Sequence, residues 1–261
     1  MRDDSPQRPT DDNRDAWRAY WQAQGMSWRT EPEIDVEHQA YLAERRAISP
    51  DIQKGVYPFR DENGGIKLTR ADVEWLLATH ESGGYQGPVD WSDPKQRTRD
   101  GLDLRGADLR GINVRDLPLA KLRGGLSRDD WHVAPTLHRE MAAVHMEETL
   151  ASRVHLEGAE LRTTHYEQAD IEGAHLEAAN LRDAHFQGAD LRRAFFDFDT
   201  VLNEVALTDR LCGGHGWRTY GGMGQIWPLW IGLGLGCWAM SMLPERRSAE
   251  KKGLRTTEHV I

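Results

Sequence analysis

Five histidines recur at intervals of ten residues: His145, His155, His165, His175 and His185. Neutral imidazole nitrogens are ligands for zinc, copper and nickel, so a spatial row of them would be a candidate metal site. The sequence contains no HExxH, GxSxG, GxxxxGK[ST] or GxGxxG motif, and these are the patterns that bring catalytic or phosphate-binding groups together. We therefore predict that the chain is not an enzyme and has no cofactor.

The segment that carries these histidines repeats every five residues. From Gly101 it reads GLDLR GADLR GINVR DLPLA, and after a break it continues from Val144 to Phe196, with an apolar residue at the centre of nearly every pentad and a small residue two places before it. A helix repeats its apolar positions every three or four residues and a strand every two, so neither fits. The period predicts a coil with flat sides whose apolar residues stack inward on those of the next coil. The predicted core residues are Leu104, Leu109, Val114, Leu119, Leu156, Leu161, Tyr166, Ile171, Leu176, Leu181, Phe186, Leu191 and Phe196.

The pentads GADLR, AANLR and GAHLE resemble the A(D/N)LXX consensus of the bacterial pentapeptide-repeat family, over about residues 101–207. The resemblance implies a mainly β fold, a right-handed quadrilateral β-helix with four pentads in each coil. His145, His165 and His185 would then form one column, and His155 and His175 a column on the opposite face, with imidazoles about 4.8 Å apart. Two interpretations stay open: a metal site on the column of three, or outward positions that merely accept a polar residue. We favour the second and predict no metal, because side chains stacked in this way do not converge as a closed site requires.

The domain organisation follows from changes in pattern. We predict a disordered N-terminus over 1–13, a mostly helical cap domain over 14–100, a first coil over 101–119, a helical insertion over 120–143 and the main β-helix over 144–207. Helices are expected over 15–24, over 34–46 and after the capping residue Thr69, and Trp75 and Trp91 could cover the exposed end of the repeat. We expect local irregularity at residues 149–151, where the large residue comes one place early, and at Pro118, which lacks a backbone donor.

The tail over 208–261 is atypical, because the pentads stop and glycine and tryptophan become frequent. Residues 226–243 form an uncharged run at the lower length limit for a membrane span. Three interpretations stay open: an authentic tail, a marginal transmembrane segment, or the product of a frame shift.

The composition limits the functions that the chain can have. A net charge of −9 argues against direct nucleic-acid binding, and two cysteines in 261 residues suit a reducing compartment, so we expect a cytoplasmic protein or one held at a membrane by its tail. The family resemblance implies a scaffold that binds a protein partner, whose identity is unknown. One alternative is an acidic DNA mimic that binds DNA gyrase or a topoisomerase, as some pentapeptide-repeat proteins do, and another is a repeat protein tethered to a membrane through residues 226–243.

Overall fold

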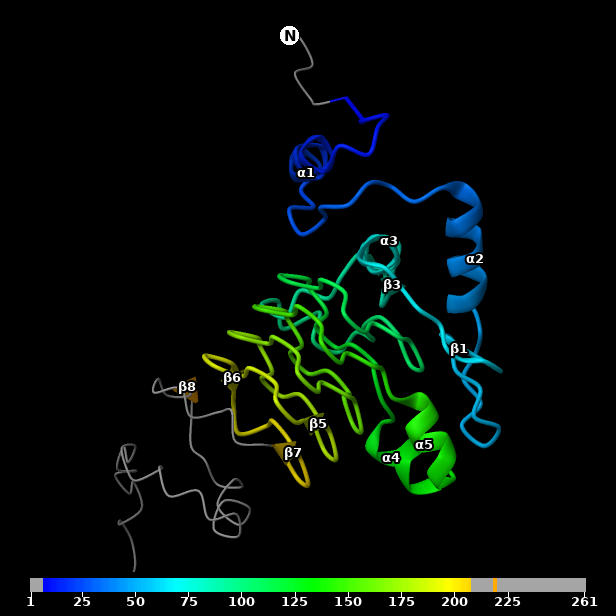
Figure 1. Cartoon of the computed structure of the whole chain (residues 1–261), viewed down its shortest axis with the longest axis vertical. Helices are drawn as coiled ribbons and strands as arrows, with labels where there is room; N and C mark the ends of the chain where they lie inside the picture. Colours follow the sequence, from blue (N-terminus) through cyan, green and yellow to red (C-terminus); the bar gives the residue numbers. More distant parts are fainter. Residues whose placement is uncertain (1–6, 208–217, 220–261) are drawn as a thin grey trace, which may run out of the picture.

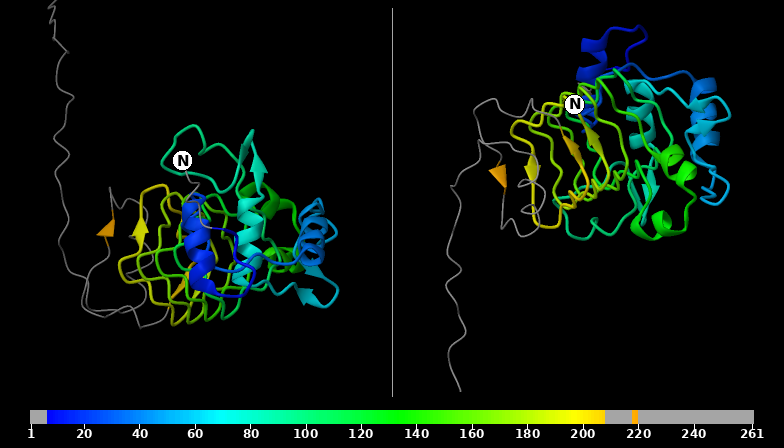
Figure 2. Two further views of the ribbon diagram at one scale, coloured as in Figure 1. Left: turned by 90° about the horizontal axis from the view of Figure 1, so that it is seen from above. Right: turned by 60° about the horizontal axis from the view of Figure 1, so that its bottom comes forward.

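The centre of the molecule is a β-helix-like stack of coils (Figures 1 and 2). The structure is a computed structural model that describes residues 7–207 and 218–219. Parallel bridges join residues twenty positions apart, such as His145 with His165 and Asp170 with Asp190. The later coils add two short parallel pairs: β5 (His185–Phe186) with β7 (Ala206–Leu207), and β6 (Phe195–Phe196) with β8 (Arg218–Thr219). The stack is held by backbone hydrogen bonds between coils.

Each coil turns a corner every five residues through one residue in the left-handed region. Two places after Met146, Ala151 and Leu161 the backbone φ is 59°, 56° and 58°. The amide N–H three places after each of these central residues donates to that residue's carbonyl, which closes a turn with a left-handed third position, as in type II. Glycine adopts this conformation without the cost that a Cβ imposes, which explains the recurrent glycine of the GADLR pentad.

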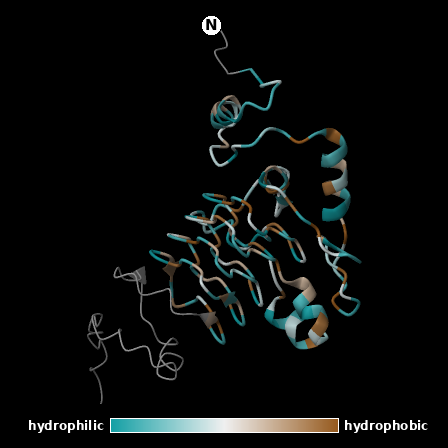
Figure 3. Ribbon diagram, in the orientation of Figure 1, coloured by the Kyte–Doolittle hydropathy of each residue, from teal (hydrophilic) through white to brown (hydrophobic). Residues whose placement is uncertain are grey.

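The side chains that point into the coils form one continuous core. Every core residue predicted from the pentads is at most 4% exposed, and together they belong to a single buried cluster. Figure 3 shows hydrophobic and hydrophilic segments alternating along the coils. Full burial of a leucine or phenylalanine contributes about 1.5–3 kcal/mol, and the small residues before the centres, such as Ala169 and Ala179, are buried beside them. Stacked apolar columns therefore stabilise the coils.

Both positions where irregularity was expected keep the register. Ala151 occupies the core with no exposed surface while Leu150 is 39% exposed, so the larger residue points outward rather than displacing the column. Pro118 forms a bridge with His155. Residues at its position in later coils donate their N–H to the preceding coil, as His155 does to the carbonyl of Leu117. Pro118 lies in the first coil, where the described residues place no coil before it on this side, so its missing donor costs nothing.

The insertion begins later than residue 120, which corrects the predicted boundary. Arg123 bridges both Asp103 and Glu160, so the ladder continues past the end of the predicted first coil at residue 119. Helices α4 (Arg128–Val133) and α5 (Thr136–Ala142) follow. The hydroxyl of Ser127 accepts a hydrogen bond from the N–H of Asp130 and caps α4.

The insertion packs against the N-terminal segment rather than standing free. Tyr57 is 1% exposed and donates its hydroxyl hydrogen to the carbonyl of His138 at 2.7 Å. Leu126, Ala134 and Ala142 complete this second small core. In Figure 1, α4 and α5 lie beside the stack at the end that the N-terminal elements occupy.

The N-terminal segment contains three helices at the predicted places: α1 (Arg14–Ala23), α2 (Val36–Arg46) and α3 (Arg70–Ala78). Thr69 and Asp72 form a capping box at the start of α3. The rest of the segment is turns and two short antiparallel hairpins, β1 (Arg60–Asp61) with β2 (Gly64–Gly65) and β3 (Glu81–Ser82) with β4 (Tyr85–Gln86). The segment is thus less helical than predicted, because short hairpins, one of which turns at Gly83 and Gly84, give no helical periodicity in the sequence.

This segment covers the first coil by continuing its ladder. The N–H of Leu68 donates to the carbonyl of Asp108, and the N–H of Asp108 donates to the carbonyl of Ile66. Trp75 is buried in the main core cluster. Trp91 lies elsewhere, against the corner at Gly158 on the side of the stack, so only one of the two tryptophans expected at the end contacts it there.

No helix among the described residues is long and apolar enough to cross a membrane. The run over 226–243 lies outside the described residues, as do both cysteines.

Candidate functional site

The five histidines form two ladders on the outside of the stack. The first ladder is His145, His165 and His185, which bridge one another in succession, and the second is His155 and His175. Neighbouring imidazoles have their ring centroids 4.7 Å apart in both ladders. The structure therefore brings together the columns that the family resemblance implied, at the spacing of stacked β-strands.

The two ladders end differently. Phe195 follows His175 on the second ladder, and its ring stacks on that imidazole with centroids 4.5 Å apart. On the first ladder the ring of His185 is inclined by 32° to that of His165, whereas His145 and His165 are within 8° of parallel. The first ladder thus offers three imidazoles and the second only two.

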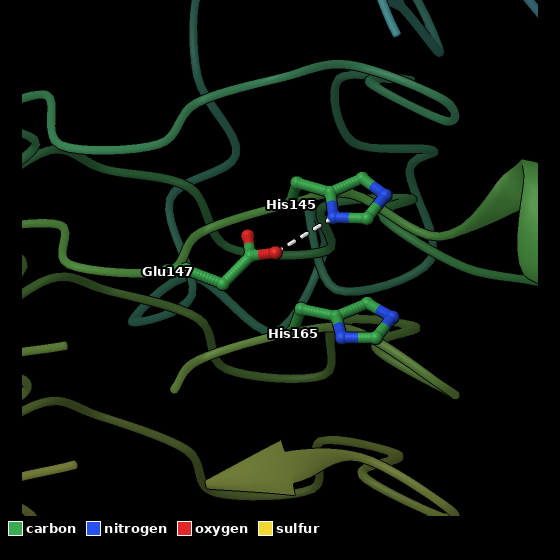
Figure 4. Close-up of side chains that lie close together, drawn as sticks. All are labelled: His145, Glu147 and His165. Carbon is green, nitrogen blue, oxygen red and sulfur yellow. Dashed lines mark hydrogen bonds and ion pairs between the residues drawn. The ribbon is translucent and has the colours of Figure 1, made fainter. Parts of the chain in front are cut away.

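A glutamate two residues after each of the first four histidines accepts a hydrogen bond from the ring. Figure 4 shows this unit for Glu147 with His145, and His165 stacked on the next rung. The Nδ1–Oε1 distances are 2.9 Å for His145 and His155, 3.1 Å for His165 and 3.4 Å for His175. An ionised carboxylate can only accept, so each Nδ1 carries the hydrogen.

These carboxylates lie largely inside the surface formed by the imidazoles. The side chain of Glu157 is 7% exposed, and those of Glu147, Glu167 and Glu177 are 23–29% exposed. Their second carboxylate oxygens are buried and form no hydrogen bond within the described residues. The Glu177 carboxylate raises the pKa of the His175 imidazole above its ordinary value, because it accepts a hydrogen bond from the ring and attracts its charged form.

The His185 rung departs from this pattern. Gln187 replaces glutamate there, and the nearest carboxylate oxygen to His185 Nδ1 is Glu167 Oε1 at 3.6 Å, from the preceding rung. Glu167 therefore lies between two imidazoles and contacts both.

The prediction from the sequence named the histidines alone and did not include the glutamates. The signal was present as a recurring His-x-Glu, in HME, HLE, HYE and HLE at residues 145–147, 155–157, 165–167 and 175–177. Residues one before and one after a pentad centre leave the coil on the same side, as alternate positions of a strand do. The spacing could therefore have identified the pairs.

Another side of the stack carries charge pairs rather than histidines. Arg115 bonds Asp170 at 2.8 Å, Arg192 bonds Asp190 at 2.7 Å, and Arg193 lies 3.2 Å from Glu172. These acidic groups are partly exposed and each has a basic partner, so this side presents mixed charge to a partner molecule.

The fold defines a class: a β-helix-like repeat protein whose outer surface carries ladders of like residues. A family model described as pentapeptide repeats (8 copies) matches residues 167–197. The chain thus carries the pentapeptide repeat that this family model describes.

Solved structures similar to the chain are themselves pentapeptide-repeat proteins in two cases. One, from the cyanobacterium Cyanothece 51142, is 22% identical over 45% of this chain and 65% of its own, with a TM-score of 0.22. Another, from Nostoc Pcc 7120, is 22% identical over 42% of this chain and 83% of its own, with a TM-score of 0.24. A third is QnrB1, a plasmid-mediated fluoroquinolone resistance protein, 16% identical over 58% of this chain and 72% of its own, with a TM-score of 0.23. The chain thus spans slightly less than two thirds of the Cyanothece protein. No curated protein sequence matches it.

Proposed function

We propose that this protein is a non-enzymatic scaffold that binds a protein partner along the outer faces of a right-handed quadrilateral β-helix. The observation that supports the proposal most directly is repetition: the same outward unit, His-x-Glu, recurs on rungs 4.7 Å apart. A partner that matches one rung also matches the next. Since the buried core already orders the coils, binding to such a face immobilises little additional chain.

DNA mimicry with DNA gyrase as the target is the alternative. A mimic needs rows of uncompensated negative charge in place of phosphates. On the side with Asp170, Glu172 and Asp190, arginines neutralise the carboxylates, and on the ladders the carboxylates lie behind imidazoles. Compensated charge of this kind favours a scaffold.

The two functions are distinguished by capture and by a gyrase assay. The full chain is used as a tagged bait in its native host, beside two variants at exposed positions on different sides, Glu148→Lys and Arg193→Glu. A scaffold recovers one stoichiometric protein, and one variant reduces its recovery while the other does not. Recovery unchanged by both variants, together with inhibition of gyrase supercoiling by the purified chain, would contradict the scaffold and support mimicry.

We also propose a cytoplasmic location, which the low cysteine content supports. Cell fractionation tests it: the protein is expected in the soluble fraction. Recovery in the membrane fraction, lost on deletion of residues 226–243, would support the membrane-tethered alternative instead.

A further inference from the structure

We propose that the first ladder binds one divalent transition-metal ion of the zinc, nickel and copper class through the Nε2 atoms of adjacent imidazoles. Glu147 and Glu167 accept hydrogen bonds from Nδ1 of His145 and His165, which leaves Nε2 with a lone pair when the ring is neutral. In Figure 4 both Nε2 atoms point away from the glutamate and to the same side.

The hydrogen bond between each imidazole and its glutamate has the same arrangement as histidine–carboxylate pairs around protein metal sites. Histidine ligands commonly donate their second ring N–H to a carboxylate, which fixes the ring and makes the ligating nitrogen more basic. On this ladder Glu167 contacts two rings, since its Oε1 lies 3.1 Å from His165 Nδ1 and 3.6 Å from His185 Nδ1. The glutamates therefore act as orienting partners and not as ligands, and the site selects imidazole-binding metals over magnesium or calcium.

The parallel rings do not converge as they stand, so binding one ion requires both imidazoles to tilt, because the lone pair of each Nε2 lies in its ring plane. Two nitrogens bound tetrahedrally at 2.0–2.1 Å from zinc are about 3.4 Å apart, and the parallel rings of His145 and His165 are separated by 4.7 Å. Each Nε2 must therefore move toward the other by about 0.7 Å while its ring tilts toward the ion, and the side-chain torsions of histidine, including its broad χ2, permit this. The imidazoles are 27–39% exposed, so this movement meets little obstruction, and the His185 ring is already inclined by 32° to its neighbour.

The shared position of His165 sets the stoichiometry. It is adjacent to both His145 and His185, so the three rings bind a single ion, whose remaining coordination positions are open to water or to a group from a partner. The second ladder has one pair only, because Phe195 takes its third rung, and it binds the same ions more weakly.

The test is a zinc titration of the full chain labelled with 15N-histidine, in a Cys212→Ser, Cys237→Ser background that removes competing thiols. We expect the Nε2 resonances of the first ladder to shift while their Nδ1 atoms stay protonated. His165→Gln should weaken zinc binding at this ladder at least ten-fold, whereas the control His132→Gln, at an exposed position on α4, should not change it. Glu167→Gln keeps every ligand and should weaken binding by about 10–100-fold.

Thermal unfolding of each variant shows whether it folds. If His165→Gln does not fold, the zinc affinity of Glu167→Gln tests the proposal. Affinity should fall as the pH is lowered, because protons compete for Nε2. The proposal would be overturned if zinc shifted the Nδ1 resonances in place of the Nε2 resonances, or if the zinc affinities of His165→Gln and His132→Gln were equal.

Discussion

Tyr166 offers a sharp test of how the core column is held together, through the variant Tyr166→Phe. Its side chain is 1% exposed, and its ring stacks on that of Phe186 with centroids 4.9 Å apart and planes within 3°. The hydroxyl is buried without a hydrogen-bond partner among the described residues. The neighbouring Thr164 hydroxyl donates its hydrogen to the carbonyl of Leu161 at 2.6 Å, so that hydrogen is not available to the tyrosine oxygen. Burial raises the pKa of Tyr166, because the phenolate would be desolvated.

The expected effect follows from what the substitution removes. A buried polar group left unpaired costs about 1–3 kcal/mol, and Tyr166→Phe removes it while keeping the stacked ring. The space vacated by one oxygen offsets part of the gain, on the order of 0.5–1 kcal/mol. The free energy of unfolding should therefore rise by about 1 kcal/mol, which for a chain of this size is about 2–4 °C in melting temperature.

Urea denaturation measures the change through the midpoint, with the m-value as a check that the unfolding transition is the same. Tyr166→Leu is the matched control: it also removes the hydroxyl but loses the stack with Phe186, so it should be less stable than Tyr166→Phe by about 0.5–1.5 kcal/mol or more. Destabilisation by Tyr166→Phe of about 1 kcal/mol would show that the hydroxyl does form a hydrogen bond, and would refute the reasoning.

Three other substitutions test the coils and the cap. Burial raises the pKa of Glu160 in the folded protein, so the folded state loses stability as the pH rises from the ordinary glutamate pKa through this raised pKa. Glu160→Gln should abolish that loss. A melting-temperature profile from pH 4 to 8 with the same slope in the variant as in the parent protein would contradict this. Gly158→Ala should lower the free energy of unfolding, measured in urea, by about 1–3 kcal/mol, because a Cβ there would lie 2.7 Å from the Trp91 ring at a φ of +63°. The control Gly173→Ala, at a φ of +66° with its nearest contact at 3.4 Å, should cost clearly less. Equal costs would rule out the ring contact as the cause. Thr69→Ala removes the capping box of α3 and should cost about 1 kcal/mol by the same measurement, while Thr69→Ser should restore most of it.

The pentad period predicted the core, and the family resemblance, which implies four pentads in each coil, added the histidine columns. An inward residue every five positions is the condition for a stacked core, so positions such as Leu161 and Leu181 can be identified without coordinates. The first and last residues of the stack were harder to predict from the sequence. Arg123 belongs to the ladder although Gly124 takes the place of the next apolar centre, and a search for apolar centres stops one pentad too early there.

Positions that seemed irregular were regular for reasons that only a neighbouring coil reveals. Pro118 does not weaken the ladder, because an N–H at this position would point toward a side of the first coil with no described partner. Leu150 faces outward because the backbone register is fixed by its bridges to Asn113 and Asp170. The β3–β4 hairpin turns at Gly83 and Gly84, and the residues that flank the β1–β2 hairpin bond to the first coil. Neither feature gives a periodic signal in the sequence.

The histidine ladders differ from the core in what the fold demands of them. The coil requires an apolar centre, a small residue before it and a corner residue that tolerates a positive φ. It requires nothing particular of the two outward positions that flank the centre, and on other sides these hold pairs as different as Asn113 with Arg115 and Glu160 with Arg162. Yet four rungs of the ladders carry the same histidine and glutamate, with the same nitrogen bonded to the same oxygen. Folding does not account for that repetition, and so the ladders are where the surface of this protein has its most specific chemistry.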